Sequence, residues 1–174
     1  MYTKTDALLQ VWAALIVSHG LATRHIQKQL ERSSPLSLDE YDVLLTISRS
    51  PQGQVRFSTL ASATMFTRSG ITRVTKRLEE RGLIKRLACP EDKRGSYATL
   101  TPHGKDALRN TWKTLAQDIS SLLEPCLTQS EAHVLHDLLG RIVGRARSLA
   151  LVQISKQNKK PPRNKSHLKL RGGV

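Results

Sequence analysis

The side chains best suited to chemistry are cations that recur at helical spacing between Thr67 and Arg81. At 100° per residue, Ile71, Val74 and Leu78 would share one face of a helix, and the polar side chains would lie opposite. A helix fits the DNA major groove, where arginine can make paired hydrogen bonds to guanine. The stretch therefore predicts a DNA-reading helix, with the candidate contact residues Thr67, Arg68, Ser69, Thr72, Arg73, Lys76 and Arg77.

The side chains of this helix suit different parts of DNA. Arg73 and Lys76 are expected to contact base edges, and Arg77 a base or a phosphate. Ser69 and Thr72 carry short hydroxyl donors near the helix N-terminus, where the helix dipole favours phosphate oxygens. An ordinary solvated basic face is the alternative.

A charged loop after the helix weighs against that alternative. Pro90–Gly95 lies between two short β-capable runs, Leu83–Cys89 and Ser96–Thr101. Because Pro, Asp and Gly favour turns, this pattern predicts a β-hairpin with a charged tip. A surface hairpin with incidental charges remains the competing interpretation of this segment.

The elements that must hold this unit are expected to be mainly helical. Aromatic residues make up only 4% of the chain and Gly is sparse, a composition that favours helices. Ser37 with Glu40, and Thr128 with Glu131, have the spacing of a capping box. Helices are predicted from Asp6 to about Glu31, from Ser37 to about Ser48, in a short segment capped by Ser58, from Thr67 to Arg81, from Thr101 to about Glu124 and from Thr128 onward, with a very short strand at Val55–Phe57.

The charge of the chain points to a polyanionic partner. The formal net charge is +14 and the pI is near 10.4, which favours nucleic acid first and an anionic membrane surface second. From Arg141 to the C-terminus there are ten Lys or Arg residues and no Asp or Glu. Residues 156–174 are expected to form a disordered basic tail, either a solubilising extension or an arm that adds nonspecific DNA affinity.

The cysteine spacing and the apolar N-terminal stretch indicate the compartment of the protein and argue against a membrane partner. Cys89 and Cys126 lack the spacing of a disulfide framework or a CxxC motif, which favours a reducing, cytoplasmic compartment. Leu8–Ser18 is apolar but shorter than the roughly 20 residues needed to cross a bilayer, so we interpret it as part of a core helix and expect no membrane partner.

The sequence contains no nucleophile motif, no paired carboxylates at catalytic spacing and no phosphate-binding glycine loop. We therefore expect no enzymatic activity, no cofactor and no metal. Two weaker alternatives stay open: a metal site at His133 and His136 with Cys126 upstream, and oxidation of Cys89 just before the hairpin tip.

Together these residues resemble the MarR family of transcriptional regulators. The resemblance is carried by Thr67–Arg73 with Arg77–Leu83 in the helix, by Pro90–Arg94 in the hairpin, and by Ala98–Thr101 with Gly104 after it. It extends over roughly residues 6–150. It implies a mainly α fold with a small β-hairpin wing, in which a homodimer binds a pseudopalindromic operator in double-stranded DNA. Two recognition helices would then lie about 34 Å apart, one turn of DNA.

The resemblance also implies roles for individual residues. Arg94 resembles the family's minor-groove arginine, Lys93 would meet phosphate, and Asp92 would fix Arg94 or bond the base of the hairpin. Met65 departs from the pattern, because the turn between the two helices often carries Gly. A small-molecule effector would bind in the crevice between dimerisation and DNA-binding parts, and the candidate lining residues are Trp12, Ile16, His19, Tyr41 and Leu45, for which plain core packing is the alternative.

The implied organisation has four parts. Residues 1–35 form an N-terminal dimerisation helix, 36–104 a winged helix-turn-helix, 105–155 the C-terminal dimerisation helices and 156–174 the tail. The expected function is a repressor that a small molecule releases from DNA. A nonspecific nucleic-acid-binding or packaging protein is the main alternative, and a membrane-surface protein is a third.

Overall fold

A computed structural model describes residues 3–64, 66–89 and 92–158, excluding the side chains of residues 62, 63, 68, 93, 94 and 151–158. The predicted Met65 turn and residues 159–174 of the predicted tail therefore lie outside the described residues.

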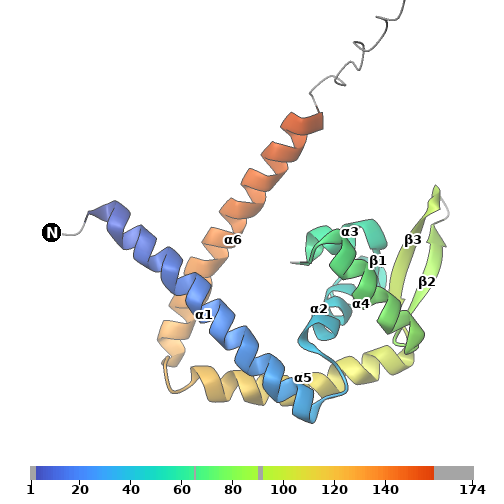
Figure 1. Cartoon of the computed structure of the whole chain (residues 1–174), viewed down its shortest axis with the longest axis horizontal. Helices are drawn as coiled ribbons and strands as arrows, with labels where there is room; N and C mark the ends of the chain where they lie inside the picture. The colour runs from blue at the N-terminus through green and yellow to red at the C-terminus, as the bar shows by residue number, and fades with distance from the viewer. Residues whose placement is uncertain (1–2, 65, 90–91, 159–174) are drawn as a thin grey trace, which may run out of the picture. The chain divides into compact units, whose positions relative to one another are not determined.

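The chain divides into two compact units between Pro125 and Cys126. The elements are α1 (Lys4–Ser33), α2 (Leu38–Ser48), η1 (Pro51–Gly53), β1 (Gln54–Arg56), α3 (Phe57–Ala63), α4 (Arg68–Glu80), β2 (Ile84–Cys89), β3 (Asp92–Leu100), α5 (Pro102–Leu123) and α6 (Gln129–Asn158) (Figure 1). The predicted fold class, mainly helical with a small β wing, is confirmed.

The main core joins α2, α3 and α4 to the sheet. Leu44, Ile47, Leu60 and Leu78 are completely buried in it. Burying four such side chains removes a large apolar area from water, which is the main driving force for folding. This core fixes α4 and the strands in one body.

The sheet has the strand order β1-β3-β2, and both pairs are antiparallel. β1 pairs only with the last part of β3, with Val55 opposite Ala98, so β2 and β3 project beyond it as a two-stranded ribbon, the wing (Figure 1). β3 begins at Asp92, four residues before the predicted Ser96, so the strand includes most of the predicted charged tip.

Two local predictions around β1 are wrong in detail. The strand covers Gln54–Arg56, and Phe57 already begins α3. Arg56 therefore occupies the N-cap position, where it makes no side-chain cap hydrogen bond, and Ser58 lies inside the first turn of the helix.

The junction between the wing and α5 is tight. Thr101 caps α5, since its hydroxyl accepts from the Gly104 amide at 3.0 Å and donates to the Gly82 carbonyl at 2.7 Å. A Cβ at Gly104 would lie 1.9 Å from the Leu83 carbonyl oxygen. Only glycine fits there, because any side chain would push α5 away from the segment that joins α4 to β2.

The C-terminal half of α1 packs against α2 and α5, where Ile26, Leu30, Tyr41 and Leu115 form a second core cluster. Its N-terminal half is different, because residues such as Trp12 are exposed. The expectation that the apolar N-terminal stretch belongs to a core helix is wrong within one chain. By length and composition alone, α1 also meets the criteria for a membrane-crossing helix.

The predicted capping box at the start of α6 is confirmed. The Thr128 amide donates to Glu131 at 2.8 Å, and the Glu131 amide donates back to the Thr128 hydroxyl at 3.3 Å. The helix continues to Asn158, three residues into the stretch expected to be tail. Its apolar residues, including Val134, Leu138 and Ile142, are exposed.

Candidate nucleic-acid interface

Local hydrogen bonds define both ends of α4. At its start, Thr67 is the N-cap, and its hydroxyl accepts from the Gly70 amide at 3.1 Å. At its end, Gly82 has a φ of 65°, and the Leu83 amide donates to the Leu78 carbonyl at 2.9 Å. This is the Schellman arrangement, which requires a residue that tolerates positive φ. The helix therefore has fixed limits.

The two faces of α4 divide as the sequence predicts. Ile71, Val74 and Leu78 are buried against the core, while Arg73 and Lys76 are exposed. Thr75 is buried as well, and its hydroxyl donates to the Ile71 carbonyl at 2.9 Å, which satisfies it without a distant partner. The exposed face thus carries cations on a rigid backbone, as contact with a DNA groove requires.

The polar candidates on α4 differ in how strongly the protein holds them. Lys76 lies 3.7 Å from Glu80, but both side chains are well exposed, and such surface pairs contribute little. Ser69 shares a 3.2 Å hydrogen bond with Thr67 at the exposed start of the helix. Arg77 is half-exposed, with Nε 3.8 Å from Oε1 of the buried Glu40. Thr72 is exposed, and the side chain of Arg68 is not among those described.

Arg56 on β1 contacts both strands of the wing, as far as the last residue pair before the turn, Cys89 and Asp92. Its Nε donates to the Tyr97 hydroxyl at 3.1 Å, its Nη2 donates to Cys89 Sγ at 3.3 Å, and Nη1 lies 3.8 Å from Asp92 Oδ2. The hydrogen bond to Tyr97, followed by the charge interactions with Cys89, Tyr97 and Asp92, raises the pKa of Arg56 above its ordinary value. One permanently charged guanidinium therefore links β1 to both wing strands.

Asp92 pairs with Cys89 beside the turn of the hairpin, not at its base, so its expected role in fixing Arg94 stays a prediction. A Cβ at Gly95 would come within 2.8 Å of Asp92 Oδ2, so the absence of a side chain there lets the carboxylate approach. Lys93 and Arg94 lie in β3 by their backbone, and their side chains fall outside the described set.

A second arginine ties the wing to α4. Arg86 on β2 donates to both carboxylate oxygens of Glu79, at 3.2 and 3.1 Å, and to the Ser96 hydroxyl at 2.9 Å. Its guanidinium also stacks over the Phe57 ring at 3.9 Å from the centroid, a favourable cation–π geometry. Sequence reasoning missed Arg56 and Arg86, because their partners on neighbouring elements follow no local spacing rule.

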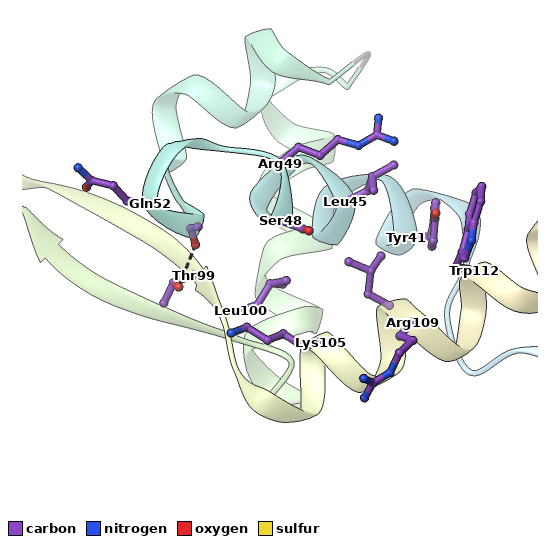
Figure 2. Close-up of a pocket in the computed structure, with 12 residues that line it drawn as sticks. Tyr41, Leu45, Ser48, Arg49, Gln52, Thr99, Leu100, Lys105, Arg109 and Trp112 are labelled. Atoms are coloured by element: carbon purple, nitrogen blue, oxygen red, sulfur yellow. Dashed lines mark hydrogen bonds between the residues drawn. The ribbon is translucent and has the colours of Figure 1, made fainter.

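A cavity of about 560 Å³ lies behind this interface, among α2, η1, β3 and α5 (Figure 2). Leu45, Leu100 and Leu108 supply apolar walls. Burial raises the pKa of Tyr41, another lining residue, while the charge of Arg49 lowers it. The cations in the lining are Arg49, Lys105 and Arg109, and the last of these pairs with Asp106. The cavity combines apolar surface with positive charge.

The five candidate effector residues do not gather in one cavity. Tyr41 and Leu45 line the cavity of Figure 2. His19, again with Leu45, lines a second hollow of about 360 Å³ between α1 and α2. Trp12 and Ile16 are exposed on α1 and line neither of these two described cavities.

Comparison with known proteins identifies relatives of this arrangement. The model of the MarR family matches residues 36–96. The structure of Sco3205, a MarR family transcriptional regulator from Streptomyces coelicolor in complex with DNA, is 30% identical; the match covers 84% of this chain and 89% of Sco3205, with a TM-score of 0.70. AbsC, a MarR family transcriptional regulator from the same organism, is 26% identical over 85% of this chain and 98% of AbsC, also with a TM-score of 0.70. The HTH-type transcriptional regulator PapX from Escherichia coli is 31% identical over 104 residues, which span 53% of this chain and 63% of PapX.

Proposed function

The chain belongs to the MarR family of transcriptional regulators, and on that premise we propose that it is a sequence-specific DNA-binding repressor that acts as a homodimer in the cytoplasm. The observation that carries this proposal is the exposed cationic face of α4, held in one rigid body with the wing. The DNA complex of the related Sco3205 supports it. No enzymatic step is part of the proposal.

On DNA, α4 enters the major groove with Arg73 and Lys76 toward the base edges. Ser69 and Thr72, at the N-terminal part of the helix, donate to backbone phosphates. The wing follows the backbone to the neighbouring minor groove, where Arg94 inserts, because a narrow minor groove concentrates negative potential. Arg56 and Arg86 hold the wing at the angle that this placement needs.

The second copy of the chain covers the exposed apolar faces of the terminal helices. Leu9 and Trp12 of α1 are 61% and 62% exposed, and Val134 of α6 is 59% exposed. Apolar surface of this extent on a soluble protein marks an interaction site. A two-fold dimer buries the same patch on both copies and sets the two recognition helices one DNA turn apart.

The cavity of Figure 2 is the proposed effector site. Its volume lies within the range of roughly 300–1,000 Å³ typical of small-molecule sites, and its apolar walls with Arg49 and Lys105 suit an organic anion with an apolar body. The Thr99 hydroxyl donates to the Gly53 carbonyl at 3.0 Å beside the cavity. Because β3 runs from there to the wing, a ligand that shifts β3 would also move the wing and release DNA.

Selection of bound sequences from a random DNA pool by the purified protein tests the function. A regulator should select a pseudopalindrome and discriminate roughly a thousandfold or more against random DNA. Equal competition by random DNA would instead support the alternative, a nonspecific nucleic-acid-binding protein.

A further inference from the structure

Glu40 is a buried carboxylate that joins α2 to the recognition helix. It is only 5% exposed. Its Oε2 accepts from Arg81 Nη1 at 2.9 Å and from the Ser37 amide at 3.0 Å, and its Oε1 lies 3.8 Å from Arg77 Nε. A buried charge is unfavourable unless it is paired and hydrogen-bonded. Because Arg77 lies on α4 and Arg81 is its C-cap, any movement of α4 away from α2 would leave the Glu40 carboxylate buried without these two cations.

Arg81 extends this link beyond the carboxylate. It is the C-cap residue of α4, and its Nη2 donates to the Pro35 carbonyl at 2.8 Å. One planar guanidinium thus bridges the end of the recognition helix to two points around the start of α2. Arginine makes such forked contacts in a fixed geometry that lysine does not reproduce.

Resting on the proposed DNA-binding function, we propose that Glu40 is a positioning residue that sets the angle at which α4 meets DNA. The carboxylate holds the C-terminal end of the helix through Arg81, and its other oxygen lies 3.8 Å from the half-exposed Arg77. Glu40 therefore governs the discrimination between operator and random DNA, and does so without touching DNA itself.

The replacement Glu40→Gln distinguishes an effect on the orientation of α4 from a general effect of charge on DNA binding. Glutamine keeps the side-chain acceptor and suits the third position of a capping box, but it removes the negative charge that holds the two arginines. Removal of a negative charge near DNA strengthens binding to all sequences alike, whereas a loosened helix weakens only operator binding. We expect the ratio of operator to random-DNA affinity to fall about tenfold, an effect of the size of one mismatched base pair.

Asp39→Asn is the matched control. Asp39 precedes Glu40 in the same first turn of α2 and is exposed, so the replacement makes the same charge change without touching the network. We expect it to leave the ratio of operator to random-DNA affinity unchanged. Circular dichroism and thermal unfolding of each variant establish that the comparison is made between folded proteins.

Arg81→Lys provides a second variant for the case in which Glu40→Gln does not fold. It keeps the charge of the exposed C-cap residue but cannot reach both Glu40 and the Pro35 carbonyl, so the affinity ratio should again fall. If Glu40→Gln and Arg81→Lys, where folded, both keep the wild-type ratio of operator to random-DNA affinity, the positioning role is overturned. A wild-type protein that selects no sequence would give a different result, because it would overturn the proposed function and the inference with it.

Discussion

The winged unit (α2 to β3) buries most of its large apolar side chains within one chain, whereas α6 and the N-terminal half of α1 leave most of theirs exposed. Leu44 and Leu78 of the winged unit are completely buried within one chain. Trp12 of α1 and Val134 of α6 sit on regular helices, yet each is more than half exposed. A regular helix therefore need not have its apolar face buried within its own chain. The winged unit buries its core within one chain, and in the proposed dimer the second copy buries the apolar faces of the terminal helices.

The largest expected effect tests the burial of the core within the winged unit. Leu44→Ala removes a fully buried side chain and should lower the free energy of unfolding by about 4 kcal/mol, because the cavity adds to the transfer energy of the deleted atoms. Chemical denaturation followed by circular dichroism measures this difference. Leu87→Ala on β2, where the side chain is 37% exposed and lies outside the terminal helices, is the control; an equal decrease there would show that the burial of Leu44 does not set the effect.

The second prediction tests whether a second copy covers the exposed apolar face of α1. Leu9→Asp places a charge on the exposed apolar face of α1 and should weaken dimerisation by about 100-fold, since an unpaired charge would become buried between the copies. Analytical ultracentrifugation measures the dimer dissociation constant, and circular dichroism should report an intact fold. An unaltered dimer would show that another surface joins the copies.

The third effect is confined to the winged unit. Arg94→Ala should reduce operator affinity by about 30-fold, or about 2 kcal/mol, because the guanidinium no longer occupies the narrow minor groove, where the negative potential is concentrated. Fluorescence anisotropy with labelled operator measures this change. The dimer dissociation constant should stay at its wild-type value, and unchanged operator affinity would refute the wing role.

Sequence reasoning succeeded where the partners lie within one helical turn. Ser37 with Glu40 and Thr128 with Glu131 are each separated by three residues, so residue type and spacing suffice to locate these two helix starts. The buried face of α4 was predictable for the same reason, because helical periodicity alone sorts its side chains.

Contacts across the fold could not be predicted in this way. Glu40 and Arg81 are 41 residues apart, as are Arg56 and Tyr97, and no periodicity connects them. The capping box at Ser37 explained Glu40 completely, so nothing in the sequence called for a second role. For α1, periodicity identified an apolar face correctly but does not say whether the same chain covers it.

The smallest effect concerns the C-terminal basic segment, whose role stays a prediction. Deletion of residues 159–174 removes six Lys or Arg residues and leaves the described part of α6 intact. If this segment binds phosphates, the slope of log affinity against log salt should become shallower by about 0.9 for each phosphate that is no longer neutralised. The selected DNA sequence should remain the same, because the bases are read by α4 and the wing. A changed sequence preference would mean that the C-terminal segment also contacts bases, and would contradict the view that only α4 and the wing read the DNA sequence.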